Sequence, residues 1–314
     1  RHVLSHGGAD AINAPTLSES AEGRELIHVD CRRYPDAISS LWVTTLGHRV
    51  PELDDALRDQ IDKVAHSTLL GNGNRVVVEL AEALRAVVPV EDAHVLFASD
   101  GAAAVEQALK IAFQFWTNQG VAGRTTYLAF GDAYHGDTMG AISLGHGGLG
   151  TRVFDPLRFP VLRAPSFADP DCFAVAIGLV EDHADELAAV VIEPLVQGAA
   201  GMQLADPEDL AELAAACRHH DVLLIADEVA VGFGRTGTLF ASEQCALRPD
   251  LLCLGKGLTG GYLPMSATVA SDRVFAAFLG PDLSDKTLYH GHSYSGNPLA
   301  AAAALRHAQL VAGG

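Results

Sequence analysis

The sequence is poor in basic residues and has no long apolar run and no Walker nucleotide-binding motif. Its 314 residues include 21 Lys and Arg against 39 Asp and Glu, a formal net charge of −18. This charge argues against nucleic acid and anionic membrane as partners, although a few local donors can still hold a phosphate group. No apolar segment approaches the length that spans a bilayer. We therefore expect no nucleic acid and no membrane partner.

Cysteine is also scarce and shows no pattern. The five cysteines are Cys31, Cys172, Cys217, Cys245 and Cys253. Their spacings are not those of a metal site, so we expect no bound metal. An odd number of cysteines in a sequence without an evident signal peptide favours a reducing, cytoplasmic location.

The chain does contain enough apolar material for a sizeable core. Hydrophobic residues make up 49% of the sequence and charged residues 19%, as expected for a globular protein. Short apolar runs alternate with longer segments of helical periodicity, for example residues 207–219 followed by residues 222–226. This alternation predicts an α/β fold with a mainly parallel sheet flanked by helices.

One lysine follows a buried strand and is surrounded by glycines, in the segment Leu251-Leu-Cys-Leu-Gly-Lys256-Gly-Leu-Thr-Gly-Gly261. Lysine is almost never fully buried without a partner. The small neighbours leave room for a flat ligand, and a desolvated lysine has a lowered pKa and can form a Schiff base. Taken alone, the segment is more typical of a surface lysine in a glycine turn.

A carboxylate lies at the end of the preceding predicted strand, where Asp227-Glu228 follow the apolar residues 222–226. Ligands of open parallel sheets bind beyond the carboxyl ends of the strands. A lysine and an acidic residue at that edge are what pyridoxal 5′-phosphate (PLP) requires, one for the aldehyde carbon and one for the pyridinium nitrogen. The two motifs in this order predict a PLP site.

Two further turns lie at strand ends. Ser99-Asp100-Gly101-Ala102 joins a predicted strand at 94–98 to a long helix at 103–119, and free N–H groups at such a helix start can bind phosphate. An ordinary strand-to-helix turn has the same pattern. Tyr134-His135 follows the strand at 125–130 and offers an aromatic ring for stacking on a planar ligand.

Together these residues resemble the class III (fold type I) PLP-dependent aminotransferases. The matching motifs are Tyr134-His-Gly-Asp137, Ile192-Glu-Pro194, Ile225-Ala-Asp-Glu228, Gly232-Phe-Gly-Arg-Thr-Gly237 and Leu254-Gly-Lys-Gly257. Within the class the sequence is most similar to the diaminopelargonic acid aminotransferases of biotin synthesis. The segments that carry this similarity are Ser39-Ser-Leu-Trp42, His66-Ser-Thr-Leu-Leu-Gly71, Val196-Gln-Gly198, Gly260-Gly-Tyr-Leu263 and His290-Gly-His-Ser293.

The resemblance implies a fold type I large domain that binds PLP over residues 48–314 and an N-terminal segment over 1–47. Relatives also have a C-terminal small domain, which we do not expect within these 314 residues. It implies catalytic roles for Lys256, Asp227 and Tyr134: the Schiff-base lysine, the acid at the ring nitrogen, and the stacking ring. Cofactor binding would also involve Gly101, Ala102, His135, His292 and Ser293. The last two would reach the cofactor of a neighbouring subunit, which requires a homodimer. Substrate binding would involve Leu41, Trp42, Tyr134, Asp137, Arg235, Lys256 and Gly291.

The implied reaction is a ping-pong transamination of 8-amino-7-oxononanoate to 7,8-diaminononanoate, with S-adenosylmethionine or lysine as amino donor. Two residues depart from the pattern: Ala102 stands where relatives often have serine, and Leu41 where many have a second tryptophan. Another class III ω-aminotransferase, an aminomutase, or a truncated non-catalytic protein of the same fold are the alternatives.

Overall fold

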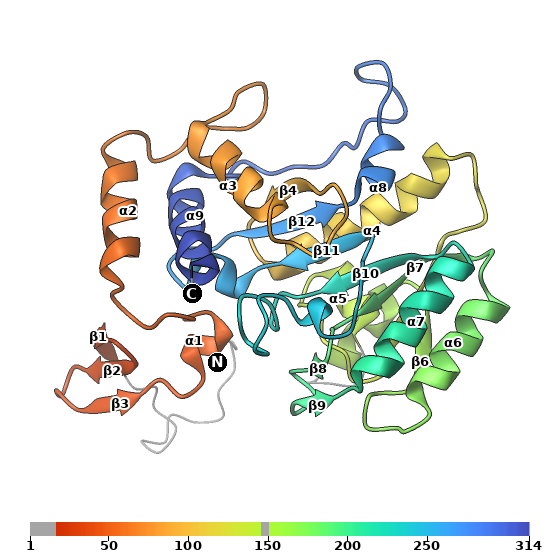
Figure 1. Ribbon diagram of the computed structural model, residues 1–314, viewed down its shortest axis with the longest axis horizontal. Coiled ribbons are helices and arrows are strands. Elements are labelled where there is room, and N and C mark those ends of the chain that lie inside the picture. Colours follow the sequence, from red (N-terminus) through yellow and green to blue (C-terminus); the bar gives the residue numbers. More distant parts are fainter. Residues whose placement is uncertain (1–16, 146–150, 314) are drawn as a thin grey trace.

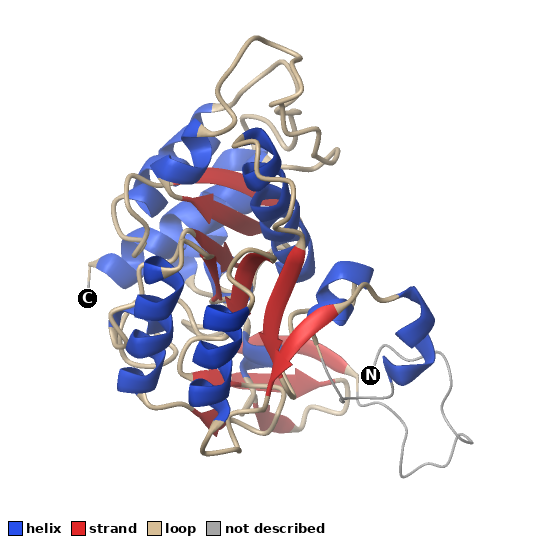
Figure 2. Cartoon of the chain, turned by 90° about the vertical axis from the view of Figure 1, so that its right-hand side faces the viewer, coloured by secondary structure: helices blue, strands red, loops and turns tan. Residues whose placement is uncertain are grey.

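The computed structural model describes residues 17–145 and 151–313. Its centre is a seven-stranded sheet with the order β4-β12-β11-β10-β7-β5-β6, flanked by helices on both faces (Figures 1 and 2). In chain order its strands are β4 (His94–Ala98), β5 (Thr126–Phe130), β6 (Val161–Ala164), β7 (Leu187–Ile192), β10 (Leu223–Asp227), β11 (Leu251–Leu254) and β12 (Ser266–Ala270).

The strands of this sheet are parallel except for β12, which runs antiparallel to both of its neighbours, β11 and β4. Every other pairing in the sheet is parallel. All the strands but β12 therefore end at the same edge. The predicted α/β architecture with a mainly parallel sheet flanked by helices is confirmed.

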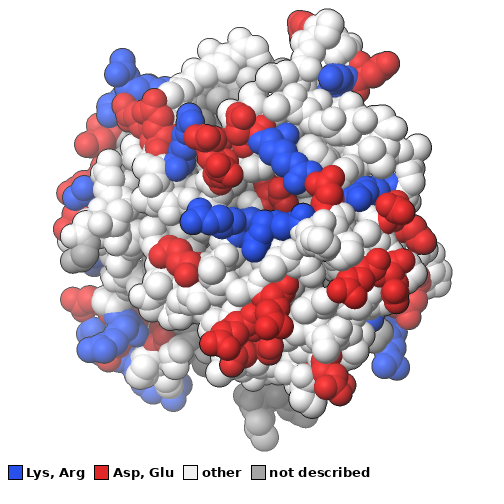
Figure 3. Space-filling view, turned by 45° about the vertical axis from the view of Figure 1, so that its right-hand side comes forward, with Lys and Arg blue, Asp and Glu red and all other residues white. Residues whose placement is uncertain are grey.

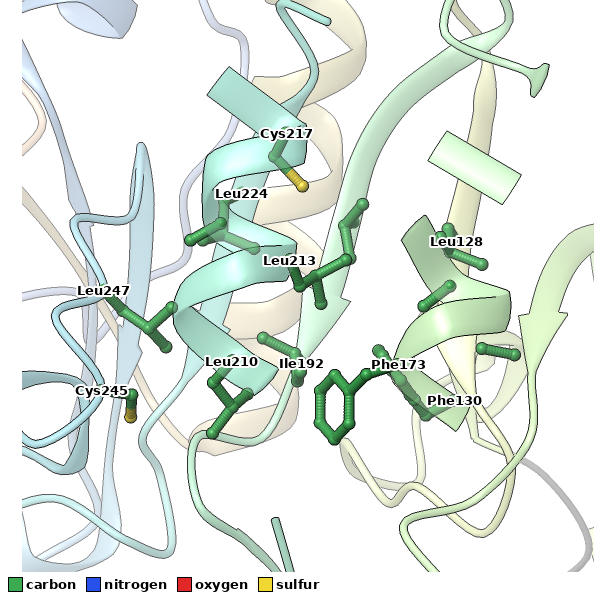
Figure 4. Close-up of a cluster of buried hydrophobic side chains, with 14 of the residues drawn as sticks. Leu128, Phe130, Phe173, Ile192, Leu210, Leu213, Cys217, Leu224, Cys245 and Leu247 are labelled. Carbon is green, nitrogen blue, oxygen red and sulfur yellow. The ribbon is translucent and has the colours of Figure 1, made fainter. Parts of the chain in front are cut away.

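One face of the sheet is covered by α6 (Cys172–Asp182) and α7 (Pro207–His219), next to α3 (Arg75–Arg85) and α9 (Pro298–Ala312). Figure 4 shows Leu210, Leu213 and Cys217 of α7 pointing toward Ile192 and Leu224 of the sheet. These side chains are almost fully buried. Burial of a leucine side chain contributes about 1.5–3 kcal/mol, so this contact fixes strands β7 and β10 in place.

The opposite face is covered by α4 (Gly101–Asn118), α5 (Met139–Leu144) and α8 (Asp272–Ala276). Along β10, Leu223 and Ile225 pack on this face, whereas Leu224 packs on the other. A strand that is buried on both faces reads as a continuous apolar run, which is why residues 222–226 were recognisable as a strand.

The N-terminal part forms a separate three-stranded antiparallel sheet of β1 (Ser18–Glu22), β2 (Glu25–His28) and β3 (Arg33–Pro35). Their alternation is weak because most of their side chains are exposed. The division of the chain at residue 47 stays a prediction, and part of it falls on residues 1–16, outside the described residues.

Predicted elements are confirmed with slightly shifted ends: the helix expected at 103–119 is α4, and the strand expected at 125–130 is β5. Helix α2 (Pro51–Ile61) lies before α3 in the chain. Asp206 and Ser271 cap α7 and α8 by accepting hydrogen bonds from the first helical turn. The short elements β6, α5, β8 (Val196–Gln197) and β9 (Gln203–Leu204) were not predicted, because each is too short to show a period.

Among the described residues, no helix combines the length and apolar character needed to cross a bilayer. On the face shown in Figure 3, basic side chains lie among acidic ones. The described cysteines are all unpaired; Cys31 is exposed and the other four are buried.

Glu228 is fully buried beside Asp227, but it caps a neighbouring turn. Its Oε2 accepts a hydrogen bond from Ala241 N–H at 2.7 Å, and its Oε1 accepts one from Ser242 N–H at 2.8 Å. Burial raises the pKa of Glu228 to about 7, from an ordinary value of 4.5. The folded state therefore retains the proton of this carboxyl to higher pH than the unfolded chain does.

This shift predicts a loss of stability with rising pH. The stabilising contribution of protonated Glu228 is complete below the unfolded-state pKa and disappears as pH rises through the folded-state pKa of about 7. Glu228→Gln cannot titrate. Between about pH 5 and about pH 7.5, we expect the unfolding free energy of the wild type to fall relative to that of Glu228→Gln by on the order of 1–3 kcal/mol.

Urea unfolding at the two pH values measures this difference. Glu212→Gln, at an exposed position of α7, is the matched control and should follow the wild-type pH dependence. Identical pH dependence of the wild type and Glu228→Gln would show that the carboxyl titrates normally.

Candidate active site

A cavity of about 420 Å³ lies where the strands end. Lys256 follows β11, Asp227 ends β10, Glu193 follows β7 and Asp100 follows β4. The residues that line the cavity are Trp42, Asp100, Gly101, Ala102, Tyr134, His135, Gly136, Asp137, Thr138, Glu193, Asp227, Val229, Ala230 and Lys256. These residues come from six separate segments, and all but Trp42 lie at or just after the carboxyl end of a strand of the sheet, as the motif positions predicted.

Lys256 enters the cavity from the short 3₁₀ turn η4 (Lys256–Thr259). Its Nζ lies 5.2 Å from the centre of the Trp42 ring. Within the described part of the chain, this ammonium makes no hydrogen bond or ion pair. Burial lowers the pKa of Lys256, and the negative charges of Asp227 and Glu193 only partly offset that shift. A larger fraction of neutral, nucleophilic amine follows.

Asp227 is held rigidly at the end of β10 and is 5% exposed. Its Oδ1 accepts a hydrogen bond from Val229 N–H at 3.0 Å, and its Oδ2 lies 2.7 Å from His135 Nδ1. Burial lowers the pKa of His135, but the hydrogen bond to Asp227 and the charges of Asp227 and Glu193 outweigh burial, so the net shift is upward. His135 therefore orients the carboxylate and supports its negative charge.

Glu193 is a cavity residue to which the sequence assigned no role. Its carboxylate accepts hydrogen bonds from Tyr134 N–H at 3.2 Å and from Gly198 N–H at 3.3 Å. Burial raises the pKa of Glu193 to about 7, with a further upward contribution from Asp227. Glu193 directly follows the buried strand β7, much as Asp227 ends β10. This position at a strand end is the feature of the sequence that could have identified it as a site residue.

Tyr134 lines the cavity beside Asp137. Burial raises the pKa of Tyr134 to about 12, and the charges of Asp137 and Asp227 add to the shift. Tyr134 is therefore a neutral phenol at physiological pH. It can present its ring to a flat ligand and donate a hydrogen bond through its hydroxyl group.

The start of α4 forms a closely packed cradle. Asp100 caps the helix by accepting a hydrogen bond from Ala103 N–H at 3.0 Å, whereas the N–H groups of Gly101 and Ala102 have no acceptor within the helix. A Cβ built on Gly101 would lie 2.6 Å from Val229 Cγ1, and one on Gly136 would lie 2.4 Å from Ala102 Cβ. Glycine at both positions lets Val229 and Ala102 pack this closely around the helix start, whose free N–H groups can bind an anion.

Trp42 reaches the cavity from a backbone turn that the sequence did not predict. Ser39, Ser40, Leu41 and Trp42 all have positive φ angles, between 49° and 70°. This short element, α1 (Ser39–Trp42), is thus a left-handed turn. Left-handed backbone costs roughly 1–2 kcal/mol for each non-glycine residue, so surrounding contacts must hold it.

Five predicted site residues lie outside the lining of this cavity. Arg235 contacts its rim, where the guanidinium donates a hydrogen bond to Trp42 O at 3.0 Å. Leu41 is adjacent to Trp42 but is 53% exposed. The other three, Gly291, His292 and Ser293, are on an exposed loop. The proposed roles of these five residues stay predictions.

The cavity residues fit PLP on three counts. The buried Nε2 atom of His135 has no partner among the described residues, so this ring remains available next to Asp227. Lys256 is a partly buried amine that has no ion-pair partner among the described residues, and glycines allow close packing at the start of α4. As for a metal, residues 17–145 and 151–313 contain no cluster of three or more His, Cys, Asp or Glu arranged to hold one.

Comparison with known proteins gives a consistent match. The family model for class III aminotransferases covers residues 8–312. The adenosylmethionine-8-amino-7-oxononanoate aminotransferase of Nitratidesulfovibrio vulgaris is 48% identical over 93% of this chain and 56% of its own length. The enzyme of the same name from Methanocaldococcus jannaschii is 42% identical over 92% of this chain and 68% of its own length. The chain thus spans between about half and two thirds of these relatives.

Solved structures agree with the sequence match. The crystal structure of the Methanocaldococcus jannaschii enzyme superposes with a TM-score of 0.92 at 40% identity, covering 98% of this chain and 72% of that one. An amine transaminase from an uncultivated Pseudomonas species, crystallised in a PLP-bound form, gives a TM-score of 0.93 at 33% identity. It covers 100% of this chain and 74% of that structure.

Proposed function

Because this chain belongs to the class III aminotransferases, which use PLP, we propose that it transfers an amino group to 8-amino-7-oxononanoate. The geometry of Lys256 and Asp227 supports this most directly, since an amine and a carboxylate line one cavity at the same sheet edge. The names of the relatives supply the substrate. These relatives are longer than the region that matches this chain. The activity of the whole protein is therefore also part of the proposal.

Each part of the cofactor has a residue suited to hold it. Lys256 would link to the aldehyde carbon, Asp227 would accept a hydrogen bond from the ring nitrogen, and the ring of Tyr134 would stack on the heterocycle. The N–H groups of Gly101 and Ala102 would bind the phosphate. When bound, PLP supplies an electron sink that stabilises negative charge at the carbon that loses a proton.

The protein residues then determine where protons and charges reside. The lowered pKa of Lys256 increases the fraction of neutral amine, which can act as a base and move a proton at a substrate carbon. Asp227 is anchored by His135 and Val229. It therefore offers a fixed negative charge that keeps a proton on the ring nitrogen. The rings of Tyr134 and Trp42 both line the cavity and would limit the access of water to it.

The cavity wall fits a long, mostly apolar acceptor. Trp42, Val229, Ala230 and the ring of Tyr134 contribute uncharged surface, and Ala230 stands where many class III members carry glutamine. We propose S-adenosylmethionine or lysine as the donor, in two half-reactions. Turnover of 8-amino-7-oxononanoate against β-alanine and 4-aminobutyrate tests this choice. Preference for either of the latter would assign the chain to another class III activity.

We also propose a homodimer, with His292 and Ser293 on each chain reaching toward the cofactor of the other. The loop that carries them is exposed and is docked on α4, where Lys110 Nζ donates a hydrogen bond to Tyr289 O at 3.3 Å and lies 3.1 Å from His290 Nδ1. A fixed loop that projects from its own subunit suits a contact in trans. Sedimentation equilibrium with and without PLP tests the proposal, and a monomer in both conditions contradicts it.

Ala102→Ser is expected to tighten PLP binding. A hydroxyl at this cradle position adds one phosphate contact, and a neutral hydrogen bond contributes about 1 kcal/mol net, which corresponds to about fivefold in dissociation constant. Equilibrium titration with PLP measures the effect. Ala103→Ser, one residue further along α4 and outside the cavity lining, should leave the affinity unchanged. Weaker binding by Ala102→Ser would place the phosphate elsewhere.

A further inference from the structure

The left-handed turn at residues 39–42 is the most strained segment of the described structure that borders the cavity. Four consecutive residues have positive φ, and none of them is glycine. Backbone of this kind persists only where neighbouring groups hold it, and it is concentrated at functional sites. The contacts that hold this turn are therefore candidates for a role in shaping the cavity.

Asp36 is the side chain that makes two hydrogen bonds to this turn, and its carboxylate is nearly buried at 6% exposure. Its Oδ1 accepts a hydrogen bond from Ser40 N–H at 2.8 Å, and its Oδ2 accepts one from the Ser40 hydroxyl at 2.7 Å. The same Oδ2 lies 2.9 Å from His48 Nε2. One carboxylate therefore binds the middle of the turn through both backbone and side chain.

The turn presents Trp42 to the cavity. The indole ring lies 5.2 Å from Lys256 Nζ, and its Cη2 atom is 3.2 Å from the point where a Cβ on Gly198 would lie. The Trp42 carbonyl accepts a hydrogen bond from Arg235. Because the ring fits against Gly198 this closely, a change in the backbone at residue 42 would shift the ring relative to Gly198 and alter the part of the cavity that Trp42 lines.

The segment is fixed again beyond the turn. Thr45 Oγ1 lies 2.6 Å from Nε2 of His307, a fully buried residue of α9. A Cβ on Gly257, next to the lysine, would lie 3.0 Å from Thr45 Cγ2. The chain is thus anchored on both sides of Trp42, at Asp36 and at Thr45, while the strained residues lie in between.

We propose that Asp36 is a positioning residue that holds residues 39–42 in the left-handed conformation and so sets Trp42 as a wall of the substrate cavity. Without the carboxylate, the turn relaxes toward ordinary backbone angles and the ring leaves Gly198. The substrate part of the proposal rests on the proposed function, whereas the placement of the ring does not. Asp36 itself touches neither substrate nor cofactor, and acts through Trp42.

Acrylamide quenching of tryptophan fluorescence tests the placement independently of activity. The chain has Trp42 and Trp116, and Trp116 is 4% exposed within the core, so a change in quenching reports on Trp42. We expect Asp36→Ala to raise the quenching constant of the accessible tryptophan about two- to threefold, because relaxation of the strained turn exposes the ring. Asp30→Ala removes an exposed aspartate that pairs with Arg32 and should leave quenching unchanged.

A substitution at Ser39 separates backbone positioning from a general loss of folding. Ser39 has a φ of 51° and, among the described residues, makes no side-chain hydrogen bond. Glycine adopts this angle without strain, whereas alanine does not. Ser39→Gly should therefore restore at least part of the wild-type quenching in the Asp36→Ala background, and Ser39→Ala should not.

Steady-state kinetics on the same variants supply the second readout. We expect Asp36→Ala to raise KM for 8-amino-7-oxononanoate about tenfold with a smaller change in kcat, since uniform binding is lost, and Ser39→Gly to reverse part of the rise. Quenching and KM that are unchanged in Asp36→Ala overturn the proposal, as does equal rescue by Ser39→Gly and Ser39→Ala. If the wild type lacks transaminase activity, the proposed function fails, and quenching alone decides the positioning role.

Discussion

Lys256→Ala is expected to abolish transamination and the visible absorption of lysine-linked PLP together. Lys256 provides an amine in the same cavity as Asp227. Its lowered pKa suits both covalent attachment of PLP and proton transfer. Loss of covalent and acid–base roles at once predicts a fall in kcat of at least about 10⁴-fold. Absorption spectra of the protein with added PLP, followed by single-turnover assays with each donor, measure both effects.

The control for this variant is Lys63→Ala, which removes an exposed lysine just beyond α2. It should retain the absorption band and the activity of the wild type. A Lys256→Ala protein that still shows the band would mean that another amine carries the cofactor. A wild-type protein that takes up no PLP would favour a non-catalytic member of the family.

Asp227→Asn should leave PLP bound but lower kcat by about 10²–10³-fold, the size of effect seen when one fixed electrostatic partner is removed from an active site. The amide has nearly the shape of the carboxylate and can still accept the Val229 N–H hydrogen bond. It lacks the negative charge that keeps a proton on the ring nitrogen. PLP titration and half-reaction kinetics separate retained binding from lost chemistry.

Glu228→Gln is the matched comparison, because Glu228 is the adjacent buried acid but faces the turn at Ala241 and Ser242. It should retain the kcat of the wild type while changing the pH dependence of stability. Equal losses of kcat in the two variants would indicate that Asp227 acts only by maintaining the structure around it.

Much of the site could be predicted because the fold places strand ends at one edge. Lys256, Asp227 and Tyr134 each follow a buried apolar run, and parallel strands bring such positions together irrespective of their separation in sequence. The seven-stranded sheet confirms that reasoning. The start of α4 was predictable for the same reason, since its glycine turn follows β4 directly.

The left-handed turn was not predictable from local sequence. Positive φ angles are usually marked by glycine, asparagine or aspartate, and Ser39-Ser40-Leu41-Trp42 contains none of them. The turn exists because Asp36 and more distant groups such as Arg235 hold it. Tertiary contacts of this kind have no period or composition that a single sequence reveals.

The resemblance assigned Arg235 and Leu41 to the substrate site, and those roles stay predictions. The structure adds their surroundings: Arg235 donates a hydrogen bond to the carbonyl of Trp42, and Leu41 is exposed beside the cavity. A motif gives the position of a residue along the chain and not the direction of its side chain. Glu193 shows the converse, since its burial and raised pKa became evident only from its surroundings.

Reductive trapping tests most directly whether Lys256 carries the cofactor. The lysines of the sequence are Lys63, Lys110, Lys256 and Lys286. Borohydride reduction in the presence of PLP, followed by peptide mass spectrometry, therefore has only four side chains among which to assign the label. We expect the pyridoxyl mass on the peptide that contains Lys256, at one label per chain, and none in Lys256→Ala. A label spread over the exposed lysines, or absent from Lys256, would contradict the account.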